Sequence, residues 1–432
     1  MAAGFIRRIR TLSAFDFLAL MTVGQAGMKH PSLAGMVSAM DVRMTREAMH
    51  MRFTKEAVTF LETCLNHALQ QRIDDAIPIQ TELLQPFKRV LIFDSSSWDV
   101  DPHLADVFPG SGGGASVANC KLQVGYEYKL GELGFFKIDP GIRPDNAYTD
   151  QLPSLLQPGD LALFDQGYFK LKTLSNIDEK GAYFLTRFYV KTTIQEAKTS
   201  TPIELGKMLS HLPGNAYQID VIMGGHKGKD TVECRLICLR VCEQVANKRR
   251  RRLLKEAQKK GRTPSISHLS LCDWTLMVTN VPDALLPAGM VRLLYTLRWQ
   301  IELLFKQLKS ILCIHQSHTK NVNRLKCQIY GKLILAVILH RIHARVNNQI
   351  WNQTRRELSF DKLYKRIQER AFSLFRLILF SVEEAILFLS EEIHRLIKYC
   401  LKSRQRSRQT TLELLERGAE YHVSPIDTAY LT

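Results

Sequence analysis

The chain has no apolar run long enough to cross a membrane. A membrane-spanning helix needs about 18 or more consecutive apolar residues, and the apolar run Leu333–Leu339 is followed at once by His340 and Arg341. The N-terminus also lacks the apolar segment and the cleavage site of a signal peptide. We therefore expect a cytoplasmic protein with no membrane partner.

Paired cysteines are also missing. The nine cysteines are an odd number and include no Cys-x-x-Cys pair. Cys234, Cys238 and Cys242 recur at four-residue spacing, but no histidine stands nearby at the spacing of a metal ligand. We interpret the cysteines as reduced packing residues of a cytosolic protein, which excludes a disulfide framework and a zinc finger.

Acidic residues are in a minority. The chain has 59 Lys and Arg against 42 Asp and Glu, a formal net charge of +17. Such a balance favours a polyanionic partner. A membrane surface is the weaker alternative, because the basic residues are spread through the chain. With 432 residues, 45% of them hydrophobic, the chain is long and apolar enough for a soluble fold of one to three domains.

Two apolar segments near the middle of the chain predict strands that each end in aspartate. The runs Arg89–Asp94 and Pro158–Asp165 are almost continuously apolar, which is typical of strands buried on both faces. Gly181–Arg187 is a third candidate strand. Since α/β sheets place ligand-handling residues at the carboxyl ends of strands, Asp94 and Asp165 are candidate site residues.

The remaining regions differ in composition. Residues 1–86 are helical in pattern, and Arg46, Met49 and Arg52 are spaced to project from a recognition helix, although an ordinary helical hairpin fits equally well. Residues 188–285 are rich in β-branched residues, whereas residues 286–432 are helical again. The β-rich region contains a basic run, which comprises Lys248, Arg249, Arg250, Arg251 and Arg252. It could be a solvated loop or a localisation-like stretch. We favour a third interpretation, in which it contacts a nucleic-acid backbone.

One helical segment, 295–309, places an acid among cations. At about 100° per residue, Tyr295, Arg298, Lys306 and Lys309 all fall within about 40° of Glu302. Leu297, Ile301, Leu304, Leu308 and Ile311 gather on a separate apolar face. A carboxylate ringed by cations suits a metal site that works on a phosphodiester.

Asp94, Asp165 and Glu302 together provide three carboxylates. Such a set can hold two Mg²⁺ or Mn²⁺ ions, one activating water or a 3′-hydroxyl and the other stabilising the leaving oxygen. Hard oxygen ligands suit these ions and not zinc.

Four ordered motifs resemble those of the DDE transposases of bacterial insertion sequences, in the IS-four group that includes the Tn-five type cut-and-paste enzyme. Tyr295, Arg298, Glu302 and Lys309 stand in the family's Tyr-Arg-Glu-Lys spacing. Asp94 lies in a similar Asp-Ser-Ser context, with Ser96 where many relatives have threonine. The segment 165–168 resembles the family's Asp-x-Gly-Tyr, and 274–282 resembles its strand ahead of the signature helix.

The resemblance implies an α/β fold: an RNase H-like catalytic domain interrupted by a mostly β insertion, with helical terminal regions. We therefore expect a helical DNA-binding region over 1–86, the first part of the catalytic domain over 87–187 and the insertion over 188–285. The second part, with the signature helix, spans 286–345, and 346–432 forms a helical region with a possible role in dimerisation.

The resemblance also implies a function. The protein would bind the terminal inverted repeats of an insertion sequence, dimerise on paired double-stranded DNA ends, cleave them, in some relatives through a hairpin, and join the 3′ ends to target DNA. It would work in the bacterial cytoplasm at the nucleoid. Asp94, Asp165 and Glu302 would bind the metal ions. Phosphate contacts would come from Tyr295, Arg298, Lys306 and Lys309, and Trp274, flanked by Trp299, would stack on a flipped base.

Two other functions compete with transposition. One is a non-catalytic repressor derived from a transposase, and the other is an RNase H-like nuclease that does not join ends. The complete set of carboxylates disfavours the repressor. The Tyr-Arg-Glu-Lys helix and the large insertion disfavour the nuclease. Core packing is the alternative role for both tryptophans.

Overall fold

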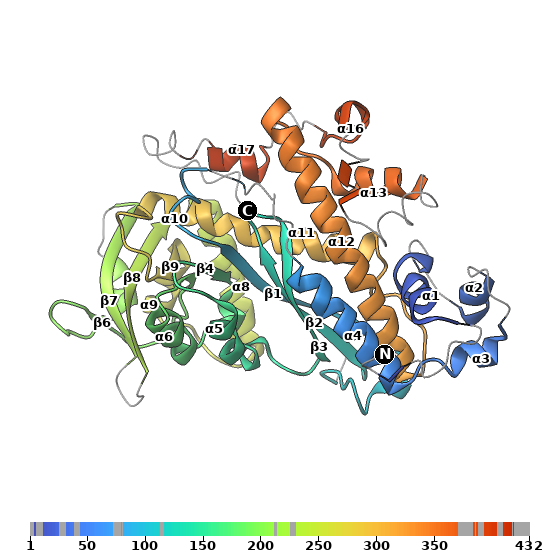
Figure 1. Cartoon of the computed structure of the whole chain (residues 1–432). Helices are drawn as coiled ribbons and strands as arrows, with labels where there is room; N and C mark the ends of the chain where they lie inside the picture. The colour runs from blue at the N-terminus through green and yellow to red at the C-terminus, as the bar shows by residue number, and fades with distance from the viewer. Residues whose placement is uncertain are drawn as a thin grey trace. The chain divides into compact units, whose positions relative to one another are not determined.

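A computed structural model gives the structure of the chain (Figure 1). It describes residues 4–5, 12–25, 32–38, 44–71, 79, 81–112, 116–210, 214–224, 230–369, 383–384, 386–387, 393–403, 409–416 and 418. The chain divides into two compact units, which are described separately. The first comprises Met1–Ile79, Asp94–Arg143 and Ile301–Arg404, and the second comprises Gln80–Phe93, Pro144–Gln300 and Gln405–Thr432.

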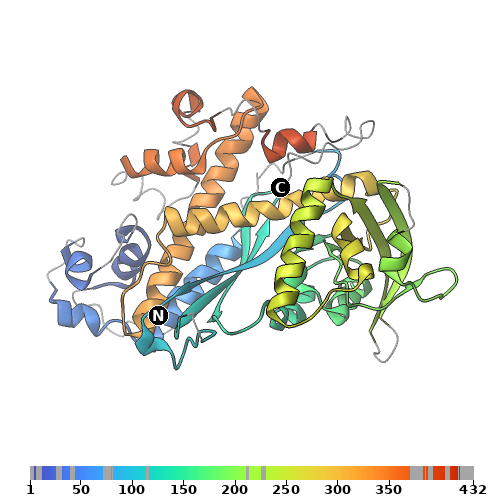
Figure 2. The same cartoon turned by 180° about the vertical axis from the view of Figure 1, so that it is seen from behind.

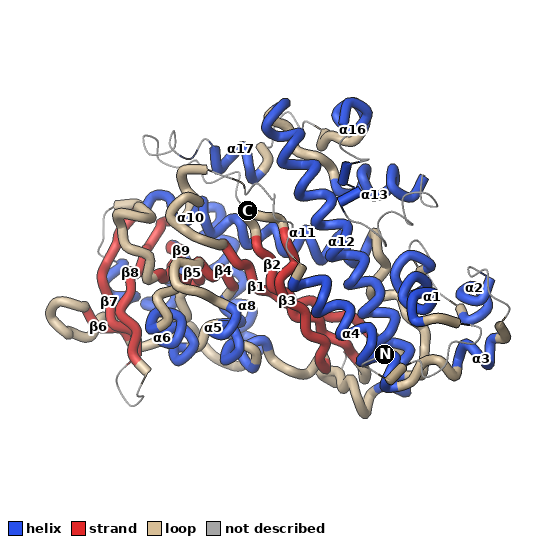
Figure 3. The backbone as a smooth tube through the Cα atoms, viewed as in Figure 1, coloured by secondary structure: helices blue, strands red, loops and turns tan. Residues whose placement is uncertain are grey.

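The described strands form one mixed sheet of nine strands, drawn in red in Figure 3. Their order is β3-β2-β1-β4-β5-β9-β8-β7-β6. β1 pairs in parallel with β4, and β4 with β5, whereas β5, β9, β8, β7 and β6 pair in antiparallel fashion. The strands are β1 (Val90–Asp99), β2 (Asn119–Glu127), β3 (Glu132–Pro140), β4 (Leu161–Phe164), β5 (Tyr183–Arg187), β6 (Ile194–Glu196), β7 (Ala216–Gly224), β8 (Thr231–Arg240) and β9 (Trp274–Thr279).

The predicted α/β class is confirmed, and the strands agree closely with the apolar runs. All four residues of β4 and the first four of β1 are buried, as expected for central parallel strands with both faces covered. The β-rich region does not form a separate sheet, because β9 pairs along β5 and continues the same one. The expected domain boundaries remain predictions.

Helices of the second unit cover the core of its part of the sheet. Phe93, Phe164 and Phe184, from β1, β4 and β5, belong to one buried cluster that also takes residues from α6 and β8. The helices of this unit are α5 (Leu152–Leu155), α6 (Leu171–Glu179), α7 (Leu205–Ser210), α8 (Glu243–Lys259), α9 (Ile266–Ser270), α10 (Ala288–Tyr295) and α17 (Thr411–Glu416).

The first unit is built on a long helix, α12 (Val322–Thr354), which α4 (Lys55–Gln70) packs against. The predicted boundary at 345 falls inside α12. No helix among the described residues is long and apolar enough to cross a membrane. The other helices of this unit are α1 (Ala14–Ala19), α2 (Leu33–Ser38), α3 (Arg46–His50), α13 (Phe360–Glu369) and α16 (Ile393–Tyr399), and α11 (Trp299–Ser310) enters it at residue 301.

The expected recognition helix is only partly as predicted. Thr45 caps α3, its hydroxyl accepting a hydrogen bond from the Ala48 amide at 3.1 Å. Arg46 is exposed and Arg52 is half-buried, but Met49 is fully buried. The prediction that Met49 projects outward is therefore wrong: its thioether packs in the core, and α3 turns that side of the helix inward.

Candidate active site

Each candidate aspartate comes directly after the last paired residue of the parallel strands β1 and β4. In the second unit Phe93 of β1 is the partner of Phe164 of β4, and each is followed directly by an aspartate, Asp94 and Asp165. One expectation needs correction. β4 ends before Asp165, but β1 continues to Asp99, so Asp94 lies within its strand, where the pairing with β4 stops.

The loop after β4 holds Asp165 in a defined turn. Its side chain caps the 3₁₀ turn Gln166–Tyr168, and its Oδ1 accepts a hydrogen bond from the Gly167 amide at 2.8 Å. A Cβ at Gly167 would stand 3.0 Å from that oxygen, so the glycine allows the close approach. Tyr168 anchors the turn in the core, where it is 1% exposed. The Asp-Gln-Gly-Tyr motif therefore sets the position of the carboxylate.

Tyr295 attaches the end of α10 to the end of β4. It lies at the end of α10, is 8% exposed, and its hydroxyl donates a hydrogen bond to the Phe164 carbonyl at 3.3 Å. A 3₁₀ turn, Thr296–Arg298, separates it from α11. Tyr295 therefore belongs to α10 and not to the helix that carries Glu302.

The rest of the helix agrees with the predicted faces. Leu297, Ile301, Leu304 and Leu308 are buried, while Arg298, Glu302 and Lys309 are half-buried and Lys306 is exposed. Ile311, also predicted on the apolar face, is half-buried and follows the last residue of the helix. Within the first unit, the Lys309 ammonium donates a hydrogen bond to the Ser97 carbonyl of β1 at 3.0 Å. Burial lowers the pKa of Lys309. Glu302 is thus carried by a helix attached to the strand of Asp94.

Two arginines near Tyr295 were missed at the level of sequence. The guanidinium of Arg187, the last residue of β5, lies 5.9 Å from the centre of the Tyr295 ring. Burial lowers the pKa of Arg292 in α10, and the nearby positive charge of Arg187 lowers it further. The rule that selected Asp94 and Asp165, the carboxyl end of a buried strand, would also have selected Arg187.

Other aspartates are engaged in structural contacts. Asp160 is fully buried in an ion pair with Arg89 and accepts a hydrogen bond from the Gln157 amide at 2.7 Å. Asp273 pairs with Arg250. These contacts account for both carboxylates without a ligand, which strengthens the choice of Asp94 and Asp165.

Trp274, for which we predicted a base-stacking role, is buried in the structure. Its side chain is 3% exposed and belongs to the core, with the Tyr217 ring centre 5.8 Å away and the Arg240 guanidinium 4.7 Å from its own ring centre. A stacked base needs an open ring face, so these contacts do not support the stacking role, which stays a prediction. Trp299 differs, because it is 50% exposed.

The basic run lies on a helix, α8, and not in a solvated loop. Arg249 donates hydrogen bonds to the Trp274 carbonyl at 2.8 Å and to the Thr275 hydroxyl at 3.0 Å, and Arg250 pairs with Asp273. Lys248, Arg251 and Arg252 are exposed. The run therefore has two roles, and only part of it faces solvent.

The residues present suit a divalent cation in their chemistry. Asp94, Asp165 and Glu302 offer hard oxygen donors of the kind that Mg²⁺ and Mn²⁺ prefer. Within the described ranges, no three His, Cys, Asp or Glu side chains are grouped closely enough to hold a metal ion.

Comparisons with known proteins point to one family. The family model described as "Transposase DDE domain" matches residues 85–338. The transposase of insertion sequence IS231B from Bacillus thuringiensis subsp. berliner is 28% identical over 439 residues, which cover 97% of this chain and 91% of that protein. The IS231F transposase from subsp. israelensis is 30% identical, covering 88% and 82%.

Another insertion-sequence transposase and one solved structure are also similar to this chain. The IS1151 transposase of Clostridium perfringens is 28% identical over 86% of this chain and 83% of its own length. Among solved structures, a piggyBac transposase synaptic complex with hairpin DNA is 10% identical with a TM-score of 0.43, covering 94% of this chain and 82% of that chain. The family model and the insertion-sequence relatives show that this chain belongs to the DDE transposases of insertion sequences, enzymes that cleave and join DNA.

Proposed function

We propose that this transposase binds the terminal inverted repeats of its own insertion sequence, cleaves the DNA ends and joins the 3′ ends to target DNA. The observation that carries the proposal is the β1–β4 register, which sets Asp94 and Asp165 directly after the paired residues Phe93 and Phe164. Glu302 supplies the third carboxylate from a helix that is attached to β1 through Lys309. We infer an RNase H-like core on the same ground.

In this proposal Asp94, Asp165 and Glu302 hold two Mg²⁺ or Mn²⁺ ions. When bound, the ions supply an activated water or 3′-hydroxyl and stabilise the leaving oxygen. Arg298, Lys306 and Lys309 hold phosphate groups beside the scissile bond. The hydroxyl of Tyr295 fixes the start of the helix, and its phosphate contact remains a prediction.

Base stacking is assigned to Trp299 in place of Trp274. Trp299 immediately follows the 3₁₀ turn and precedes Glu302 by three residues, and half of its surface is exposed. Stacking on an aromatic side chain contributes about 1–3 kcal/mol per base, enough to help hold a base out of the duplex. A hairpin intermediate, a homodimer on paired ends and a place at the nucleoid complete the proposal.

The substitution Glu302→Gln tests the catalytic role. It removes one negative charge with little change of shape, so we expect cleavage of a duplex that carries the element's terminal repeat to fall about a thousandfold or more in Mg²⁺, while binding persists. Glu179→Gln, an exposed acid of α6, is the matched control and should cleave normally. Chelation of the metal should stop cleavage by the wild type, and added Mg²⁺ should restore it.

The same assay separates the competing functions. Cleavage that survives in Glu302→Gln would rule out Glu302 as a metal ligand. Specific binding without any cleavage by the wild type would identify a repressor, and cleavage without joining of the 3′ ends would identify a nuclease.

A further inference from the structure

Helix α8 (Glu243–Lys259) carries the whole basic run and has two distinct sides. Ala246 is its buried residue. On the inner side Arg249 holds the backbone and hydroxyl groups at the start of β9, and Arg250 pairs with Asp273 and Asn247. These arginines fix α8 to the sheet of its own unit, so their charges are committed to the fold.

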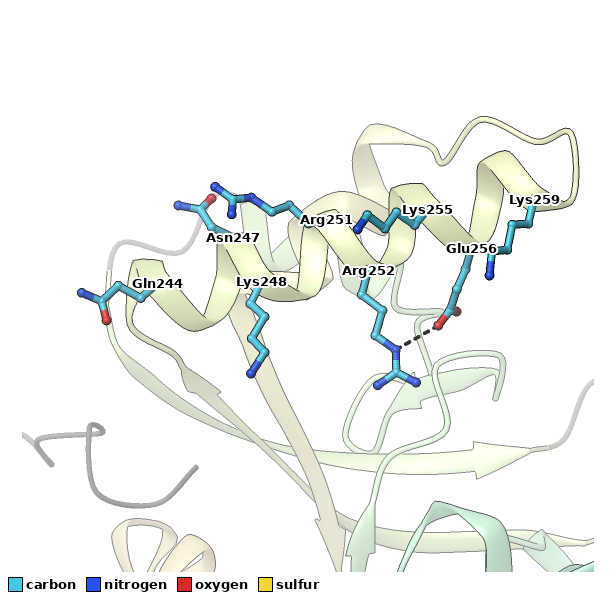
Figure 4. Close-up of a pocket in the computed structure, with 8 residues that line it drawn as sticks. All are labelled: Gln244, Asn247, Lys248, Arg251, Arg252, Lys255, Glu256 and Lys259. Atoms are coloured by element: carbon cyan, nitrogen blue, oxygen red, sulfur yellow. Dashed lines mark hydrogen bonds and ion pairs between the residues drawn. The ribbon is translucent and has the colours of Figure 1, made fainter.

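The outer side is a stripe of cations along one broad helix face, shown as sticks in Figure 4. Seen from behind, α8 runs in front of the strands of its unit (Figure 2). We define the α8 stripe as Lys248, Arg251, Lys255 and Lys259, which are all exposed. Within the part of the chain that the structure describes, none of the four forms an ion pair.

One acid interrupts this face. Glu256 accepts a hydrogen bond from Arg252 at 2.9 Å, and both side chains are mostly exposed. An exposed pair of this kind is weak. The stripe therefore keeps a net positive charge, and like charges three or four residues apart on a helix repel each other. An anion bound along the face would relieve that repulsion.

The length of the stripe suits a nucleic-acid strand. At about 1.5 Å per residue, Lys248 and Lys259 are about 16 Å apart along the helix axis. One DNA strand carries a phosphate about every 3.4 Å along its axis. Four cations over this distance can neutralise several successive phosphates of one strand.

A membrane surface fits this helix less well. A helix that lies on a membrane needs a broad apolar face opposite its cations. On α8 the exposed large apolar residue is Leu254, 47% exposed, and the inner side is occupied by contacts to β9. The charge pattern without an apolar face favours a phosphodiester backbone.

We propose that the α8 stripe binds the DNA phosphodiester backbone outside the catalytic site, with Lys255 and Lys259 as contacts and Arg249 and Arg250 as structural anchors. The proposal rests on the proposed function only in taking DNA as the partner. Since no base edge is needed, the stripe contributes affinity without sequence specificity.

The test measures how binding to a labelled duplex of mixed sequence depends on salt. Each phosphate neutralised contributes about 0.9 to the slope of log K against log salt concentration. The variant Lys255→Gln/Lys259→Gln should therefore lower the slope by about 2. Lys191→Gln/Lys198→Gln removes two exposed lysines elsewhere in the same unit and should leave the slope unchanged, as should Lys255→Arg/Lys259→Arg.

A variant that is expected to bind DNA more tightly shows that the effects do not come from loss of folding. Glu256→Gln removes the acid from the face and frees Arg252, so it should raise affinity for the duplex. An unchanged slope in Lys255→Gln/Lys259→Gln, together with unchanged affinity in Glu256→Gln, would overturn the proposal. The proposal would also be overturned if Lys255→Gln/Lys259→Gln lost binding to anionic phospholipid vesicles but bound DNA like the wild type. That result would show a membrane site.

The outcome is independent of the cleavage assay. If Glu302→Gln abolishes cleavage but the α8 variants bind like the wild type, the proposed function stands and the stripe fails. If the salt slope falls in Lys255→Gln/Lys259→Gln while the wild type cleaves no terminal repeat, the inference about the α8 stripe holds and the proposed function fails.

Discussion

At the scale of single residues, identity alone did not decide which side chains are available to a ligand. Asp94, Asp165 and Glu302 were predicted from their motifs, but the burial of Trp274 was not. The ring is covered by Tyr217 and Arg240, which come from β7 and β8 and reach it only through the antiparallel pairing. No local pattern around a strand tryptophan reports which neighbours cross its face.

The two tryptophans should respond oppositely to truncation. Trp274→Ala removes a large core side chain and should lower the free energy of unfolding by about 3–5 kcal/mol. Trp299→Ala removes a half-exposed one and should change it by about 0.5 kcal/mol or less, while weakening binding to the DNA end. Denaturant unfolding and DNA-binding assays of both variants check this; a stable Trp274→Ala would contradict the packing.

A second pair of residues tests close packing of α12. A Cβ at Gly331 would stand 2.0 Å from the Met21 carbonyl oxygen, whereas nothing lies within 4 Å of a Cβ at Gly289 in α10. Gly331→Ala should destabilise the protein by about 1–3 kcal/mol or more. Gly289→Ala should be neutral or stabilise by up to about 1 kcal/mol. Thermal unfolding of the two variants compares them, and equal effects would refute the close approach.

At the scale of elements, strands were predicted better than the helices between them. The apolar runs 89–94 and 158–165 identify β1 and β4 because buried parallel strands have few polar residues. α8 was missed because its hydrophobic side is almost absent: it is held by arginine contacts to β9 and buries only Ala246. A helix fixed by polar tertiary contacts leaves no apolar period in the sequence.

A buried histidine should make the stability of α12 depend on pH. His340 is 6% exposed and stacks on Phe360 with ring centres 4.5 Å apart, and burial lowers its pKa to about 3. The unfolded chain, with an ordinary pKa near 6.5, takes up the proton first. Stability is therefore full above about pH 6.5 and falls as the pH drops toward 3, by about 2 kcal/mol at pH 5.

Unfolding measured at pH 7 and pH 5 gives the total loss, to which His343, whose pKa burial lowers to about 4, also contributes. His340→Leu removes the titration, so its stability should change about 2 kcal/mol less between the two pH values, whatever its absolute stability. An identical pH dependence in the variant would show that other groups cause the loss.

At the scale of the whole molecule, composition predicted the class of binding partner and the motifs predicted the reaction. Neither predicted the order in which the strands pair. The excess of 17 positive charges predicted a polyanion, and the family match agrees with DNA. The mostly β insertion looked like a separate body because its composition changes at residue 188. The pairing of β9 with β5 makes it an extension of the sheet that carries Asp165, and such long-range pairing leaves no local signal in the sequence.

The distribution of thiols over the whole molecule predicts which cysteine can be labelled selectively. Of the nine cysteines, six are buried, Cys64 and Cys272 are half-buried, and Cys242 is exposed. Burial raises the pKa of Cys64, Cys272 and, to about 12, Cys238, which suppresses the reactive thiolate. Cys242 should therefore react first with a maleimide dye, and peptide mass mapping of the modified protein checks that the label is there.

Cys242 is the residue immediately before α8. A fluorophore attached to it would sit at one end of the helix, without replacing any cation, and its emission would respond to duplex binding in real time. The natural sequence thus carries its own attachment point for an optical reporter.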